Sequence, residues 1–127
     1  MAILKSAALA ILAIGLAGSA FADCDAAHGE KVFAKCKSCH QIGEKARNLI
    51  GPALTGIVGN EAASVEGYKY SKAFQQKKEE GLTWTDDALG EYLESPKDMV
   101  PGTKMTFPGL ADEHDRADVI CYLETFE

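Results

Sequence analysis

The sequence of 127 residues predicts an all-α protein in which short helices are joined by long loops. Three observations lead to this prediction. No segment alternates apolar and polar residues with the two-residue period of a strand. Residues that cap helices stand before apolar stretches of helical period near both ends of the chain. Between Gly43 and Asn60, glycine recurs at short intervals and interrupts any regular period.

The N-terminal segment has the features of a cleaved secretory signal. Lys5 precedes an apolar run over residues 7–17, and residues 20–22 have the small-x-small pattern of a cleavage site. An uncleaved anchor is the alternative, but the run is shorter than the ~20 residues that span a bilayer. We expect cleavage after Ala22, export to the periplasm, no stable membrane insertion, and a single domain over residues 23–127.

The rest of the chain predicts helices near its start, in its third quarter and at its end. Asp25 can cap the first helix and Thr85 the second, which ends at Ser95-Pro96. The last helix starts near Asp112. The residues expected along one face of each helix are Val32, Phe33 and Cys36 in the first, the buried stripe of Leu89, Tyr92 and Leu93 in the second, and Val119, Ile120, Leu123 and Phe126 with Tyr122 beside them in the last.

Acidic residues outnumber basic ones, 19 against 13, and the formal net charge is −6. This balance argues against nucleic acid as a partner. The charges are unevenly spread, because Lys31 to Asn60 holds five basic residues and one acid, whereas Met105 to Glu127 holds six acids and one basic residue. This is either ordinary solvated surface or a dipole that steers the basic part toward an acidic partner.

Cys36, Cys39 and His40 form a C-x-x-C-H motif, which is the attachment signature of a covalent c-type haem. On one helical turn the two sulfur atoms share a face, and His40 lies four residues after Cys36. The thiols can then reach one edge of the porphyrin while the imidazole reaches the iron. A redox dithiol and a partial zinc site are the alternatives, although the adjacent Cys-His pair is awkward for zinc.

The second axial position of the iron has two candidate ligands. Met99 and Met105 both lie in the loop-like segment 95–108. A thioether ligand raises the reduction potential, which suits an electron carrier, but methionine more often serves only in packing. His28 lies too close to the haem motif on the same helix to cross the ring, and His114 stands among acids in a solvated stretch.

Seven ordered motifs extend over nearly all of the predicted mature chain. They are Gly29-x-x-x-Phe33, Cys36-x-x-Cys39-His40, Gly51-Pro52-x-Leu54-x-Gly56, Gly67-Tyr68-x-Tyr70, Gly81-Leu82-Thr83-Trp84, Tyr92-Leu93-x-x-Pro96-Lys97 and Pro101-Gly102-Thr103-Lys104-Met105. By these motifs the chain resembles the class I cytochromes c, closest to soluble bacterial cytochrome c2 and mitochondrial cytochrome c. The resemblance implies a small cytochrome c fold, in which the N- and C-terminal helices cross and shorter helices and long loops wrap around one covalent haem.

The resemblance also implies which residues contact the haem. It makes His40 and Met105, rather than Met99, the axial ligands, and it assigns to the Pro52 carbonyl a hydrogen bond from the His40 ring. The aromatic residues that it places at the haem are Tyr70 and Trp84, which hydrogen-bond a propionate, and Tyr92, which lies near the ligand sulfur.

Two features depart from the mitochondrial pattern. The segment between Tyr70 and Trp84 is longer, and Phe74 stands near the place of an internal asparagine, which predicts a drier haem pocket and an altered potential. The remaining cysteines, Cys24 and Cys121, lie on elements that the family fold packs together. An even leftover pair in an oxidising compartment favours a disulfide, with two free thiols as the alternative.

The leading hypothesis is a soluble periplasmic one-electron carrier that is a monomer and not an enzyme. The resemblance implies a quinol-oxidising cytochrome complex as donor, and a terminal oxidase or photosynthetic reaction centre as acceptor. The alternative is a small haem enzyme, a peroxidase or small-molecule reductase, which needs an exchangeable distal ligand and an acid-base group. The basic residues expected to dock partners are Lys35, Lys37, Arg47, Lys97 and Lys104.

Overall fold

A computed structural model describes residues 23–127, and the predicted signal segment with its cleavage point lies outside them. The helices are α1 (Ala26–Phe33), α2 (Lys72–Glu79), α3 (Asp86–Glu94), α4 (Pro96–Met99) and α5 (Glu113–Glu124). Within the described range, the only strand-like pairing is an isolated bridge between Glu61 and Thr83. The all-α prediction is confirmed. None of these helices is long and apolar enough to cross a bilayer.

The predicted caps start three of the helices. The side chains of Asp25, Thr85 and Asp112 each accept hydrogen bonds from backbone N–H groups in the first turns of α1, α3 and α5. These bonds satisfy donors that have no partner inside the helix. Helix α3 ends at Glu94, immediately before Ser95-Pro96, as predicted.

The sequence predicts neither α2 nor α4, and α4 changes the position of Met99. The sequence predicts Met99 in a loop, whereas the structure makes it the last residue of α4, partly buried against the core. Phe126 was also misplaced by the prediction. Helix α5 ends at Glu124, and the Phe126 ring packs beyond that end at 5.1 Å from the Tyr122 ring.

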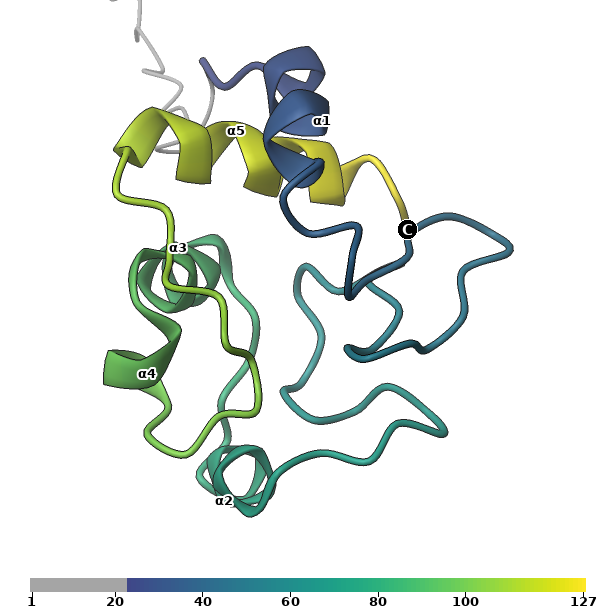
Figure 1. The fold of residues 1–127 in the computed structure, drawn as a ribbon, viewed down its shortest axis with the longest axis vertical. Helices are drawn as coiled ribbons and strands as arrows, with labels where there is room; N and C mark the ends of the chain where they lie inside the picture. Colours follow the sequence, from purple (N-terminus) through teal and green to yellow (C-terminus); the bar gives the residue numbers. More distant parts are fainter. Residues whose placement is uncertain (1–22) are drawn as a thin grey trace, which may run out of the picture.

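Helices α1 and α5 cross at one end of the molecule (Figure 1). Gly29 makes the close approach feasible, because a Cβ at this position would clash with the backbone carbonyl of Asp118. One turn later, the rings of Phe33 and Tyr122 pack at a centroid distance of 5.4 Å. The helix crossing implied by these residues is present in the structure.

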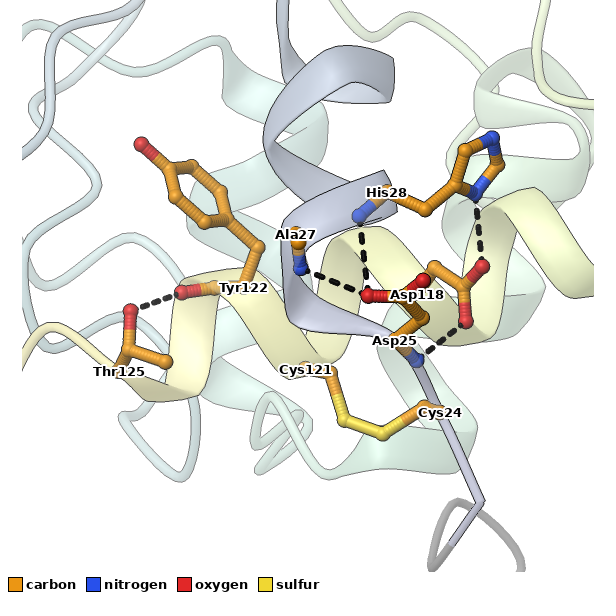
Figure 2. Close-up of a disulfide and its surroundings, with 8 residues drawn as sticks. All are labelled: Cys24, Asp25, Ala27, His28, Asp118, Cys121, Tyr122 and Thr125. Atoms are coloured by element: carbon orange, nitrogen blue, oxygen red, sulfur yellow. Dashed lines mark hydrogen bonds and ion pairs between the residues drawn. A yellow bond between two sulfur atoms is a disulfide. The ribbon is translucent and has the colours of Figure 1, made fainter.

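A disulfide joins Cys24 to Cys121 beside this crossing (Figure 2). Their Cα atoms are 6.2 Å apart, which lies within the usual range for a disulfide. Asp118 adds two polar contacts from α5, because its carboxylate accepts from the Asp25 backbone N–H at 2.8 Å and lies 2.7 Å from His28 Nδ1. The start of α1 is therefore fastened to α5 both covalently and by hydrogen bonds.

The other elements surround the centre of the molecule (Figure 1). Helices α3 and α4 form one flank, α2 lies at the end opposite the α1–α5 crossing, and the long loops before α2 form the other flank. The core joins these parts through buried side chains of helices and loops alike. The buried apolar residues are Val32, Phe33, Ile57, Ala62, Trp84, Leu89, Tyr92, Leu93, Val100, Leu110, Val119, Ile120 and Leu123.

Candidate haem site

A largely apolar cavity of about 410 Å³ lies between the loops and the helices. Its volume falls within the range of about 300–1,000 Å³ that is common for ligand pockets. Every residue that the sequence assigns to the cofactor contributes to its lining. These residues are Cys36, Cys39, His40, Pro52, Tyr70, Trp84, Tyr92 and Met105.

The C-x-x-C-H motif forms the helical turn that the sequence predicts. The backbone N–H groups of Cys39 and His40 both donate to the Cys36 carbonyl, at 3.1 and 2.9 Å. This turn presents both cysteine sulfur atoms and the imidazole to one cavity. Burial raises the pKa of the Cys36 thiol, as does neighbouring Cys39, whereas Lys35 opposes the shift.

The His40 ring is held in a single orientation. Its Nδ1 lies 2.7 Å from the Pro52 carbonyl oxygen, which can only accept, so Nδ1 carries the proton and Nε2 keeps a lone pair for a metal. Burial lowers the pKa of His40, with the Pro52 bond opposing, and this favours the neutral ring that coordination requires. Gly51 packs its backbone against the ring, because a Cβ there would come within 2.7 Å of His40 Nδ1.

Met105 is the methionine that lines the cavity, and Met99 is absent from the lining. His28 and His114, the other candidates for the second ligand, also lie outside it. The Met105 backbone is fixed through Thr103, whose hydroxyl oxygen accepts from the Met105 N–H at 3.3 Å and lies 2.9 Å from the Tyr92 hydroxyl. Sequence reasoning gave Thr103 no role, although it belongs to the same motif as Met105.

Aromatic rings form the wall beside Met105. Trp84 and Tyr92 are almost fully buried, and burial raises the pKa of the Tyr92 hydroxyl while the Thr103 hydrogen bond opposes the shift. Burial also raises the pKa of Tyr70, whose hydroxyl accepts the Val65 backbone N–H at 3.0 Å. The contacts of Tyr70 and Trp84 with a propionate stay a prediction.

Two of the basic residues expected to dock partners, Lys35 and Lys104, line the cavity. The Lys104 ammonium donates to the Lys69 carbonyl at 2.5 Å and lies 5.3 Å from the centre of the Tyr68 ring. Lys37, Arg47 and Lys97 are exposed but do not belong to the cavity lining.

This donor set fits a covalently held haem. Such a haem requires an apolar cavity and two thiols with an oriented imidazole in one turn, and all of these are present. The thioether in the same lining is one of the groups that can serve as a second ligand of haem iron. The fold and site therefore define a small c-type haem protein. The family model described as Cytochrome c matches residues 26–127, and the chain belongs to the cytochrome c family.

Known relatives agree with this assignment. The chain is 52% identical to cytochrome c-554 of Methylosinus trichosporium over 110 residues, which covers 87% of this chain and 81% of the relative. It is 50% identical to cytochrome c2 of Rhodomicrobium vannielii over 107 residues, with 84% and 83% covered. Among solved structures, cytochrome cH from Methylobacterium extorquens is 46% identical, has a TM-score of 0.73, and is matched over 80% of this chain and 98% of its own.

Family membership decides between the interpretations of the cysteine motif. The small cytochrome c fold is confirmed, and a covalently bound haem c is the cofactor that the family implies. The redox dithiol and the partial zinc site are therefore set aside.

Proposed function

We propose that this protein is a periplasmic one-electron carrier in which His40 and Met105 are the axial ligands of haem c. The observation that carries the proposal is that Met105 shares one cavity with Cys36, Cys39 and His40. When bound, the haem iron supplies the centre that takes up and releases one electron. Relatives named cytochrome c2 and cytochrome c-554 support this function for a chain about half identical to them.

The chain itself performs the tasks that electron transfer requires of a protein. Pro52 orients His40. Tyr92 and Thr103 hold residues 101–105, which we call the Met105 segment. The apolar lining restricts water. If His40 and Met105 both hold the haem iron, the chain would keep the same two ligands in both oxidation states, so little bonding would need to rearrange on electron transfer. A small haem enzyme would instead need an exchangeable distal ligand, so this alternative is the less favoured one.

Recognition of partners would begin with basic residues around the cavity. Lys35 and Lys104 stand at its lining, and Lys37, Arg47 and Lys97 would extend the basic surface. Such a surface attracts acidic partners in fast, weak and salt-sensitive encounters. We propose a quinol-oxidising cytochrome complex as donor and a terminal oxidase or photosynthetic reaction centre as acceptor. Residues 1–22 would direct export and be removed after Ala22.

The ferric spectrum tests the ligands. Wild-type holoprotein should be low-spin and show the weak thioether-to-iron charge-transfer band. Met105→Ala should lose this band, whereas Met99→Ala, the matched control in α4, should keep it. A wild-type iron that is high-spin and open to added ligands would instead favour the haem enzyme.

The salt dependence of electron transfer tests the docking surface. In stopped-flow mixing with a quinol-oxidising complex, the bimolecular rate should fall steeply as salt rises, because ions screen the attraction. Lys35→Glu should lower the rate at low salt by about tenfold, within the range expected for electrostatic steering. Lys78→Glu, an exposed charge reversal on α2, serves as control. Equal rates for the two variants would contradict this surface.

A further inference from the structure

Helix α2 has an unusual attachment to the rest of the protein. It contains no buried residue, and within the described range it makes no substantial packing with another helix. Only two of its side chains, Ala73 and Phe74, pack against the hydrophobic core. Helix α2 therefore contacts the core of the protein through these two side chains.

Phe74 enters the aromatic wall of the haem cavity. Its ring meets the Tyr92 ring edge-on at 5.5 Å, and it lies 6.0 Å from Trp84 and 6.3 Å from Tyr70. Phe74 also lines the cavity itself. It is thus the side chain around which the three other aromatic rings gather, and its packing limits where the Tyr92 ring can lie.

The position of Tyr92 bears directly on the Met105 segment. The Tyr92 hydroxyl reaches Thr103 Oγ1 at 2.9 Å, and the same oxygen accepts the Met105 N–H at 3.3 Å. Ala73 adds a second contact, because it packs close to Gly102. A Cβ added to Gly102 would lie only 3.3 Å from the Ala73 Cβ. Helix α2 consequently contacts the Met105 segment in two ways. Ala73 packs against it directly, and Phe74 contacts it indirectly through the Tyr92 ring and its hydroxyl.

We infer that Phe74 is a positioning residue for Met105. It holds the Tyr92 ring so that the hydroxyl stays on Thr103, and this keeps the Met105 segment closed over the cavity. The inference rests on the proposed function, because it takes Met105 as a ligand of the iron. A residue that only filled the core would stabilise the fold without favouring the closed Met105 segment over an open one.

Competition by imidazole measures the opening of the segment. Added imidazole binds ferric iron only after Met105 leaves, so its apparent affinity increases when the segment opens more readily. Phe74→Leu should bind imidazole about threefold to tenfold more tightly than wild type, in proportion to the loss of an edge-to-face aromatic pair. Phe126→Leu is the matched control, because this ring packs on Tyr122 outside the cavity. It should lower thermal stability yet leave the imidazole affinity unchanged.

A second variant separates the hydroxyl from the packing. Tyr92→Phe keeps the ring and removes only the bond to Thr103, so it should raise imidazole affinity to a similar extent. Combined with Phe74→Leu it should add little, because both changes interrupt the same connection. Fully additive effects, or equal imidazole affinities for Phe74→Leu and Phe126→Leu, would overturn the inference while leaving the thioether band of wild type intact. Absence of that band in wild type would overturn the proposed ligation and this inference together.

Discussion

At the scale of single residues, the contact between Gly51 and the His40 ring is the most restrictive in the site. The glycine backbone lies so close to the imidazole that any side chain would clash with it. The hydrogen bond from His40 Nδ1 to the Pro52 carbonyl depends on this packing, since Pro52 follows Gly51 directly. Both the orientation and the basicity of His40 are therefore controlled by two consecutive loop residues.

Gly51→Ala should disturb both properties. The added methyl group has to displace the His40 ring or the loop, which should lower the free energy of unfolding by about 1–3 kcal/mol. A weakened Pro52 bond makes the imidazole a poorer electron donor to ferric iron, so the reduction potential should rise. Denaturant unfolding and potentiometric titration measure the two effects. Gly90→Ala in α3 is the control, because a Cβ there meets nothing within 4 Å; an unchanged potential in Gly51→Ala would contradict this account.

The residues that line the cavity could be named from the sequence because each belongs to a short motif with its own chemistry. Cys36, Cys39 and His40 are recognisable from spacing alone. Choosing Met105 over Met99 required the resemblance, since both sulfur atoms stand in one segment of similar composition. The role of Thr103 could not be predicted, because its contacts with Tyr92 and Met105 depend on distances that spacing does not give.

At the scale of elements, the predicted helices are those that combine a cap with an apolar period. Helix α2 was missed because Phe74 is its single large apolar residue and so produces no periodic pattern. Its cap was available as a signal, since the Ser71 hydroxyl accepts the Phe74 N–H at 3.2 Å. Helix α4 has four residues, too few to show a period. Ser95-Pro96 predicts the end of the preceding helix, but Pro96 also begins the next one.

The contact between α3 and α5 predicts a dependence of stability on pH. Partial burial and the neighbouring carboxyl of Asp86 raise the pKa of Glu124 to about 7. A carboxyl with a raised pKa binds its proton more tightly in the folded state, so stability should decrease as pH rises from about 4.5 to 7 and then level off. The effect should be small, under about 1 kcal/mol, because Glu124 is exposed to solvent.

Glu124→Gln removes this titration. At pH 8 the variant should be more stable than wild type, and the two should converge near pH 4.5, close to the ordinary pKa of the carboxyl. Denaturant unfolding at several pH values measures the difference. Glu79→Gln on α2 is an exposed carboxyl-to-amide control. A Glu124→Gln variant that is less stable than wild type at pH 8 would contradict the predicted loss of stability with rising pH.

At the scale of the whole molecule, the haem site and the disulfide lie in different parts of the fold. The haem site occupies the centre, where helices and loops meet, whereas the disulfide lies at the crossing of α1 and α5. Neither Cys24 nor Cys121 contributes to the cavity lining. Stability and redox behaviour should therefore respond separately to changes at these two places.

Replacing Cys24 and Cys121 together by serine should lower stability without altering the redox centre. The disulfide links residues separated by 97 positions and restricts the unfolded chain, so its loss should cost about 2–4 kcal/mol of unfolding free energy. The lower end of this range is expected, because the thioether bonds to haem already constrain the same chain. The reduction potential and the ferric spectrum should match those of wild type, since the site residues keep their contacts.

Denaturant unfolding of the oxidised holoprotein tests the stability, and it is done without a reductant, which would also reduce the iron. Potentiometric titration tests the reduction potential. A Cys24→Ala/Cys121→Ala variant controls for the polarity of serine. Mass spectrometry after alkylation under non-reducing conditions should find neither cysteine modified in wild type. Alkylation of both cysteines would show that Cys24 and Cys121 are not joined by a disulfide. A shift in potential equal to that of Gly51→Ala would instead show that the helix crossing and the haem site are coupled.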